Sequence, residues 1–405
     1  MTTETVETLQ LPFDRPGVLD VGPTFARLRA RHPVTRVLTP AGDPAWLVTG
    51  YDEAKQLFGS DRLGRSHPHP ERASRISASG FMGGPTGNFA TEKADHSRMR
   101  RLLVPAFSAR RMRQLEDDVQ TLTDDLLDRM IAAGTGGTPV DLHELLSVPL
   151  PIYVICRLLG VPYADRDHFK DLSERAATMT GDDPVTAIVE LMQYTGRLAE
   201  AKRAEPGEDV ISDLVAAQRE DPMFDDNQLA MMVAGLLFAG HETTVNRISI
   251  GVLLLLENPA ARDALVADPS IVSRVVEEVL RLAAPDGVGL ARYAHADLTV
   301  GEGEHRVTIP AGDAVIFSTL ATNRDGRAFD QPDTFDVGRA PNAHLSFGHG
   351  AHFCIGASLA RTELKVVLAG LFARLPGLRL AVDPAELRLH TERLTGGLYE
   401  LPVTW

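Results

Sequence analysis

The most constraining feature of this chain is a glycine-rich loop near its C-terminal end that holds one of its two cysteines. Residues 346–356 read SFGHGAHFCIG, and a helix-forming run follows over 357–371. Glycines such as Gly348 and Gly356 allow tight turns and a close approach of the backbone to a flat, bulky group. Cys354 comes just before the expected helix start, where backbone N–H groups and the helix dipole favour a thiolate. The loop therefore predicts a reactive or metal-binding cysteine.

The surroundings of Cys354 narrow the choice of metal. A single thiolate with no second cysteine nearby is a poor zinc site, but it suits the axial position of a haem iron. His352, two residues earlier, is placed to reach a haem propionate. Two alternatives stay open on the residues alone. One is a glycine-rich turn with a core cysteine, and the other is an open zinc site formed by His349, His352 and Cys354.

With every signature position filled, this loop resembles the haem-binding signature of the cytochrome P-450 monooxygenases. The resemblance implies haem b, with Cys354 as the thiolate ligand of the iron and Phe347, Gly348 and Gly356 beside the cofactor. It implies a mainly α fold with the haem between a long central helix and the helix after the cysteine loop. A single domain over 1–405 is expected, with its β-rich part at approximately 33–50, 286–320 and 376–405 and the remainder helical.

The expected central helix covers 226–257, begins at the helix start signal of Asp225 and would be roughly 48 Å long. Its middle contains Gly240, Glu242 and Thr243, which are poor choices for a buried helix interior, and such conflicts mark functional sites. The Thr243 hydroxyl is predicted to bond the Ala239 carbonyl and to open a groove. The alternative is a tolerated kink with an exposed acid.

This segment also matches the Ala-Gly-x-Glu-Thr oxygen-activating motif of the family. The resemblance implies that Ala239 and Gly240 contact the haem. It further implies that Glu242 and Thr243 organise the water that delivers protons, so they act as a relay and not as nucleophiles.

Basic residues upstream form a second candidate contact with the haem. His96 and Arg100 are four residues apart and share one helix face, where two donors suit a pair of carboxylates. For residues 96–101 taken alone, the alternative is a solvated basic helix face. The family places a His-x-x-x-Arg pair here, which favours the propionates, and Arg292 resembles a further propionate ligand.

A Glu-x-x-Arg pair, Glu278 and Arg281, is a weak signal alone because many helices carry such ion pairs. Downstream, 329–339 supplies the family's Phe-x-x-Pro-x-x-Phe segment and ends in Arg339. The resemblance implies a buried network of Glu278, Arg281 and Arg339 with a structural role, since arginine forks satisfy a buried carboxylate.

The predicted substrate pocket combines helix spacing with family likeness. Spacing back from Thr243 directs one face of the central helix to the distal side of the haem, and the family adds contacts from a long loop at 64–95, from a segment near 288 and from a turn near 396. The expected lining residues are Phe89, Met232, Gly235, Leu236, Val288, Gly289 and Leu398.

Composition excludes several classes. The formal charge of −14 argues against general binding of nucleic acid or anionic membranes. Two cysteines exclude a disulfide framework, and Cys156 reads as a buried structural thiol. The polar N-terminus is no signal peptide, and the longest apolar run, at 229–240, is too short to span a bilayer. We therefore expect a cytoplasmic protein that is no membrane protein and acts as a monomer.

The resulting prediction is a monooxygenase that inserts one oxygen atom from O2 into a C–H bond or alkene of a lipophilic small molecule. A polyketide or terpenoid intermediate of antibiotic biosynthesis is expected from the general likeness. Electrons would come from NAD(P)H through ferredoxin reductase and ferredoxin, which would dock on Arg98, Arg101, Arg110, Arg111, Arg113 and Arg361. Two alternatives are a peroxygenase, which should lack the acid–threonine pair, and a non-catalytic haem protein for recruitment or ligand sensing, which should have lost Glu242, Thr243 or Cys354.

Overall fold

The computed structural model describes residues 9–77, 83–179, 181, 183–221, 223–283 and 291–405. Most of this part of the chain is helical, and its helices are α1 (Pro23–Arg31), α2 (Tyr51–Phe58), α3 (Glu92–Leu103), α4 (Ala109–Ala133), α5 (Pro149–Leu159), α6 (Arg166–Ala177), α7 (Asp183–Ala204), α8 (Val210–Ala217), α9 (Asp226–Glu257), α10 (Pro259–Ala267), α11 (Val272–Leu282), α12 (Thr319–Thr322) and α13 (Ala357–Arg374).

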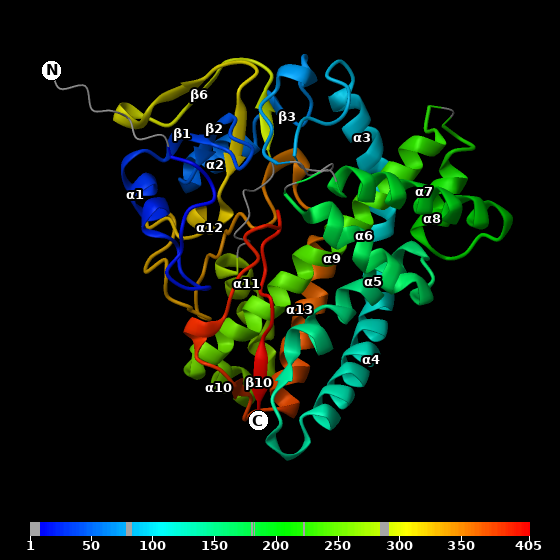
Figure 1. Cartoon of the computed structure of the whole chain (residues 1–405), viewed down its shortest axis with the longest axis vertical. Helices are drawn as coiled ribbons and strands as arrows, with labels where there is room; N and C mark the ends of the chain where they lie inside the picture. Colours follow the sequence, from blue (N-terminus) through cyan, green and yellow to red (C-terminus); the bar gives the residue numbers. More distant parts are fainter. Residues whose placement is uncertain (1–8, 78–82, 180, 182, 222, 284–290) are drawn as a thin grey trace.

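The strands are short and lie mainly at one corner of the molecule (Figure 1). They are β1 (Val34–Leu38), β2 (Pro44–Val48), β3 (Leu63–Gly64), β4 (Val140–Asp141), β5 (Arg292–Ala294), β6 (Leu298–Val300), β7 (Val307–Ile309), β8 (Ala314–Phe317), β9 (Arg379–Leu380) and β10 (Pro402–Thr404). One sheet has the order β1-β2-β8-β5-β3, a second has β4-β10-β9, and β6 pairs with β7. The expected β-rich ranges left out β3 and β4, because two-residue strands carry no alternation to detect.

The long helix α9 organises the helical part. Its bounds are those predicted, and the Asp225 side chain caps it by accepting from the backbone N–H of Gln228 at 2.8 Å. It runs through the centre of the molecule, in contact with α5, α7, α11 and α13 (Figure 1). Among the described residues, no helix is long and apolar enough to cross a membrane.

A buried ion network fixes α11 to the segment that leads to the cysteine loop. Arg281 donates to both oxygens of Glu278, at 2.8 and 2.7 Å, and both side chains are at most 1% exposed. Arg339 donates to Glu278 at 3.2 Å, so the structure brings together the three charged residues expected to meet. Asn342 also donates to this carboxylate, at 3.0 Å. The negative charge is therefore hydrogen-bonded on several sides, as burial requires.

Asn323 extends this network to the start of the cysteine loop. Its side-chain amide donates to the carbonyl of Arg281 at 3.1 Å and to the hydroxyl of Ser346 at 2.8 Å. Its carbonyl oxygen accepts from the backbone N–H of Leu345 at 2.8 Å. The loop thus starts from a position that the buried ion network sets.

Replacing Arg281 should reveal what this network contributes. Arg281→Leu leaves the Glu278 carboxylate buried without its main partner, so we expect unfolding free energy to fall by roughly 3–5 kcal/mol. Chemical denaturation measures this. Arg379→Leu is the matched control, because Arg379 is exposed and its side chain makes no hydrogen bond or ion pair with the described residues. It should change stability by about 0.5 kcal/mol or less. Equal stability of the two variants would show that the ion network does not stabilise the fold.

Candidate active site

The cysteine loop closes on itself just before α13. The backbone N–H of Cys354 donates to the carbonyl of Phe347 at 2.9 Å, and that of Phe353 donates to Gly350 at 3.0 Å. Gly350 has φ +73°, and a Cβ there would lie 2.9 Å from the carbonyl oxygen of Phe58, so only glycine lets the loop rest on the end of α2. Gly348 also has positive φ, at +70°. The glycines therefore serve loop geometry as predicted.

The Cys354 side chain is accessible within a deep recess. It is exposed, yet the protein around it is dense enough that burial raises the pKa of the thiol. The Gly356 N–H and the charges of Arg100, Arg361 and Arg247 oppose this increase without overcoming it. The expectation of an intrinsically favoured thiolate was therefore wrong for the protein alone, because burial outweighs the helix start. A bound metal cation would supply the missing stabilisation.

Helix α9 leaves one stripe of its surface uncovered. The stripe consists of Met232, Gly235, Leu236, Ala239, Gly240 and Thr243, which are half-buried or exposed although most of their neighbours on α9 are buried. We call it the open face. A Cβ at Gly235 would meet no atom within 4 Å, so space lies directly beside it. The Thr243 hydroxyl donates to the Ala239 carbonyl at 2.8 Å, which confirms the predicted bond.

Gly240 has a different role from the rest of the open face. A Cβ there would lie 2.8 Å from Cδ1 of Ile155, so the missing side chain lets α5 approach α9. Glycine at this position is explained by helix packing, in addition to any contact with a cofactor.

Glu242 lies off the open face, on the buried side of α9. The hydroxyl of Thr395 donates to one of its oxygens, and the other, Oε1, has no hydrogen-bond partner among the described residues. Burial raises the pKa of Glu242 to about 7, with Thr395 and Arg393 acting in the opposite direction. The group can therefore hold or release a proton near neutral pH.

Four basic side chains gather near the cysteine loop: Arg65, His96, Arg292 and His352, which we call the cationic cluster. The rings of His96 and His352 lie 3.9 Å apart. Burial, followed by Arg292 and His96, lowers the pKa of His352 to about 3. Burial, followed by Arg65, lowers the pKa of Arg292 to about 10. No ion pair of Arg292 is found within the part of the chain that the structure describes.

The positive charges of Arg65 and Arg292 therefore repel each other, while burial and neighbouring positive charge lower the pKa values of His96 and His352. The nearby carboxylate of Glu92 accepts from the backbone N–H groups of Arg65 and Ser66 and from the Ser66 hydroxyl, so it is already engaged. A bound group with two carboxylates would relieve the repulsion. Arg100 lies beside this region, because it donates to the carbonyl of Phe353 at 3.0 Å.

A haem fits these residues on both of its chemical demands, since an accessible thiol in dense surroundings lies near two guanidinium groups and two histidines. The zinc alternative does not fit as well. In the described ranges, no three side chains of His, Cys, Asp or Glu are gathered closely enough to hold a metal. The structure places His352 against His96 and not in a set of three ligands.

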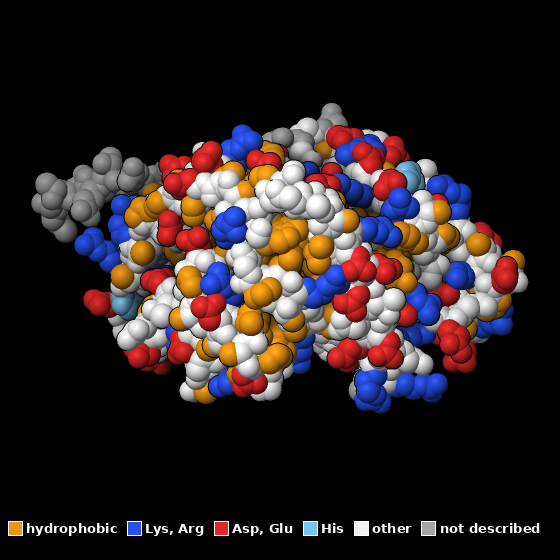
Figure 2. Space-filling view, turned by 90° about the horizontal axis from the view of Figure 1, so that it is seen from below, with side chains coloured by type: hydrophobic (Ala, Val, Ile, Leu, Met, Phe, Trp, Pro, Cys, Tyr) orange, Lys and Arg blue, Asp and Glu red, His pale blue; other side chains and the backbone are white. Residues whose placement is uncertain are grey.

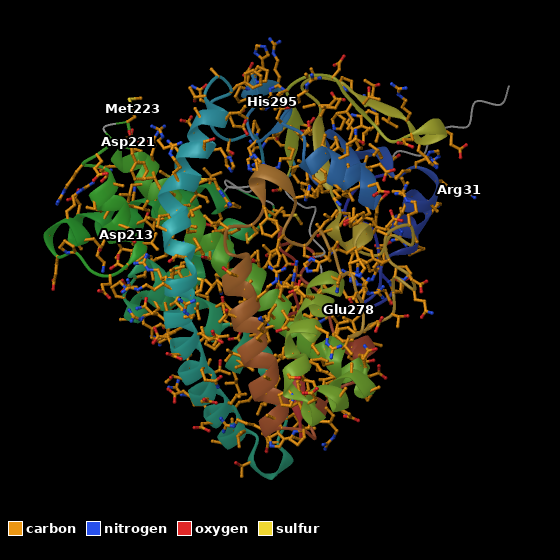
Figure 3. The ribbon with its side chains drawn as sticks, turned by 180° about the vertical axis from the view of Figure 1, so that it is seen from behind. Arg31, Asp213, Asp221, Met223, Glu278 and His295 are labelled. Atoms are coloured by element: carbon orange, nitrogen blue, oxygen red, sulfur yellow. The ribbon has the colours of Figure 1, made fainter. Side chains whose placement is uncertain are left out.

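The remaining predicted pocket residues are Leu398, Phe89, Val288 and Gly289. Leu398 is fully buried in the main core, and its place in the substrate pocket stays a prediction. Phe89 packs its ring 4.7 Å from that of His295, which lies at the upper edge of the molecule in Figure 3. Val288 and Gly289 fall outside the described residues.

Two contacts were absent from the sequence predictions. Arg65 belongs to the cationic cluster, but it follows a two-residue strand in a segment without periodicity. Thr395 reaches Glu242 from 153 residues away. A signal for the second contact existed in the pair Gly396 and Gly397, which marks a tight turn next to Thr395.

Comparison with known proteins agrees with the fold and this site. The cytochrome P-450 family model matches residues 176–376. Pentalenolactone synthase of Streptomyces exfoliatus is 43% identical, with 98% of this chain and all of that protein covered. Mycinamicin IV hydroxylase/epoxidase of Micromonospora griseorubida is 39% identical over 97% of this chain and 98% of the relative. The crystal structure of a pimaricin epoxidase has TM-score 0.85 and 40% identity, covering 98% of this chain and all of the other.

A mainly helical fold with a cysteine loop opposite an uncovered central helix defines a haem-thiolate monooxygenase that uses O2. This chain belongs to the cytochrome P-450 family. Its named relatives hydroxylate, epoxidise or oxidise nitrogen, and several belong to antibiotic biosynthesis.

The raised pKa of Glu242 predicts a pH-dependent contribution to stability. The folded-state pKa of about 7 exceeds the ordinary value of 4.5, so the folded protein binds this proton more tightly than the unfolded chain. The contribution is complete below about pH 4.5 and is lost as pH rises through 7. Relative to Glu242→Gln, the wild type should lose roughly 3 kcal/mol of unfolding free energy across this window.

Chemical denaturation of both proteins at a series of pH values measures the difference. Since all other ionisable groups are shared, their contributions largely cancel. A difference between the two proteins that stays constant with pH would show that folding does not raise the pKa of Glu242.

Proposed function

We propose that this enzyme binds haem b through the Cys354 thiolate and oxidises a lipophilic small molecule beside the open face of α9. The observation that carries this proposal is the joint presence of a recessed thiol and the cationic cluster. In this proposal the whole chain forms one domain. Phe347, Gly348 and Gly356 would surround the sulfur, because Phe347 accepts from the Cys354 N–H and a Cβ at Gly356 would lie 4.0 Å from Sγ.

The cationic cluster would hold the two haem propionates. Arg292 is buried and Arg65 is half-buried, and guanidinium groups are suited to carboxylates. His96 and His352 would regain charge next to the propionates. Arg100 would lie between the propionates and the cysteine loop, given its bond to Phe353. Ala239 and Gly240 would approach the ring from α9.

When bound, the haem supplies the activation of O2 and the transfer of one oxygen atom. The chain supplies position and protons. Glu242 would hold a proton at its carboxyl group near neutral pH, and the Thr243 hydroxyl on the open face would orient the water that carries it onward. The acid–threonine pair favours this reaction over that of a peroxygenase.

The substrate would be apolar and would carry few charges. Met232, Gly235, Leu236 and Ala239 present no charged group on the open face, and Gly235 leaves room. Relatives that make pentalenolactone or modify mycinamicin support a terpenoid or polyketide intermediate of antibiotic biosynthesis. Hydroxylation of a C–H bond or epoxidation of an alkene would be the reaction.

Electrons would come from NAD(P)H through ferredoxin reductase and an acidic ferredoxin. Three arginines expected at the docking surface are already neutralised in the protein. Arg98 pairs with Asp95, Arg111 with Asp213 and Arg361 with Glu277. Asp213 and Asp221 lie at the outer edge formed by α8 and its following loop (Figure 3). These three arginines therefore offer little attraction to a partner.

The remaining three form a better candidate. Arg101, Arg110 and Arg113 are exposed and make no ion pair with the described residues. Val104, between them in sequence, is 53% exposed, and Phe353 of the cysteine loop is 41% exposed. By contrast, the face seen from below mixes acidic and basic side chains (Figure 2). We therefore place the dock at Arg101, Arg110 and Arg113, beside the loop of Cys354.

Replacing the cysteine tests the haem ligand. Cys354→His should abolish the red-shifted Soret band of the reduced CO complex, because that band requires a thiolate ligand. Cys156→Ala is the control, since Cys156 is buried and burial raises the pKa of its thiol to about 12. It should keep the band. A red-shifted band in Cys354→His would assign the iron to another residue.

Charge reversal tests the dock. Arg101→Glu should slow the first electron transfer from ferredoxin by about tenfold at low salt, because electrostatic attraction speeds association. The difference should shrink as salt rises, since the Debye length falls from about 10 Å at 0.1 M to about 3 Å at 1 M. Stopped-flow reduction measures both. Arg379→Glu makes the same charge change in β9 and is the control. Equal slowing of both variants would show that net charge, and not a dock at Arg101, causes the effect.

A further inference from the structure

The contact between Glu242 and Thr395 joins the central helix to the last part of the chain. Thr395 is only 7% exposed, and its hydroxyl donates to Glu242 Oε2. Glu242 Oε1, also buried, has no hydrogen-bond partner among the described residues. One oxygen of the acid is thus fixed, while the other is available to bind or release a proton.

A second contact from α9 fixes the same turn. The side-chain amide of Asn246, one helical turn after Glu242, donates to the carbonyl of Thr395 at 2.9 Å. A Cβ at Gly397 would lie 2.1 Å from the Asn246 Oδ1, and Gly397 has φ +106°. Only glycine therefore allows this turn to reach α9. The approach brings Thr395 within hydrogen-bonding distance of Glu242.

The turn is also attached to the end of α6. The backbone N–H of Leu394 donates to the carbonyl of Ala177 at 2.9 Å, and that of Met179 donates to Glu392 at 3.0 Å. The side chain of Arg393 lies 3.5 Å from Glu174 of α6. Thr395 is thus held from both sides, by α6 and by α9.

Space for one water molecule adjoins Thr395. A cavity of about 20 Å³ is lined by Thr395, Asn246 and Arg15 together with apolar side chains. This volume suffices for one water, and the three named residues supply polar partners. A wider pocket of about 390 Å³ shares Arg15, Val18 and Leu389 with the cavity and opens toward the surface. Arg15 therefore borders both the surface pocket and the cavity next to Thr395.

We propose that Thr395 is a positioning residue for Glu242. Its hydroxyl holds one oxygen of the acid against the C-terminal turn and joins the acid to the water-sized cavity behind that turn. The proposal rests on the proposed role of Glu242 as proton donor. Only a proton is transferred: it adds to the carboxylate, which becomes neutral, and no electron moves. The charged groups facing Glu242 are Arg393 from the C-terminal segment and Glu174 from α6, with His241 next to it on α9.

Thr395→Val and Thr395→Ser separate the hydroxyl from the shape of the side chain. Valine removes the donor at nearly constant volume, so the ionised form of Glu242 loses a hydrogen bond and its protonation midpoint should rise by about one pH unit or more. Serine should restore the wild-type midpoint. Thr391→Val is the matched control, because Thr391 is exposed on the same segment and should leave the midpoint unchanged.

The midpoint is read in the resting holoenzyme by infrared absorption of the protonated carboxyl group, with Glu242→Gln as the spectral reference. Product formed per NADPH consumed is the second measurement, and it should fall severalfold in Thr395→Val and recover in Thr395→Ser. A wild-type midpoint in Thr395→Val overturns the proposal, and so does failure of serine to restore it. The infrared titration needs no turnover, so it tests the positioning role of Thr395 independently of the role of Glu242 as proton donor. Full activity of Glu242→Gln would instead overturn that role.

Discussion

The buried pair of Glu278 and Arg281 is the interaction on which the active site depends. Burying two charges is costly, and the cost is offset only when each charge is satisfied on several sides. Here that requirement recruits Arg339 and Asn342 around the carboxylate and backbone carbonyls around the guanidinium. Asn323 then links α11 to Leu345 and Ser346 by hydrogen bonds. The cysteine loop consequently has a defined origin before any cofactor binds.

The net charge of the chain and the charge gathered near the cysteine loop have opposite signs. The chain carries a net charge of −14, yet the cationic cluster gathers near the cysteine loop, and the nearby carboxylate of Glu92 is engaged by backbone N–H groups. Buried cations repel one another strongly in a medium of low polarity. Such a site is poorly satisfied alone and favours a ligand with carboxylates. The affinity for the haem would thus come partly from relief of repulsion within the protein.

Local patterns in the sequence predicted the features that depend on local structure. The bounds of α9, the Thr243–Ala239 bond and the glycine-rich loop follow from periodicity, capping and backbone geometry. Long-range partners were harder, because Thr395 and Arg65 lie in irregular segments whose contacts depend on the whole fold. The different directions of Glu242 and Thr243 could have been read from the helical angle between adjacent residues. The place of Leu398 in the pocket stays a prediction, because a family likeness gives its turn a location but not its side chain a direction.

The backbone pairing of α6 with the last segment of the chain has a mechanical consequence. The backbone N–H of Leu394 donates to Ala177 of α6, that of Met179 donates to Glu392, and Thr395 follows Leu394 directly in sequence. A tilt of α6 would therefore pass along the chain from Leu394 to Thr395, and through the hydroxyl of Thr395 to the carboxyl group of Glu242. The orientation of a helix and the position of a proton would thus be coupled through hydrogen bonds and one step of covalent chain.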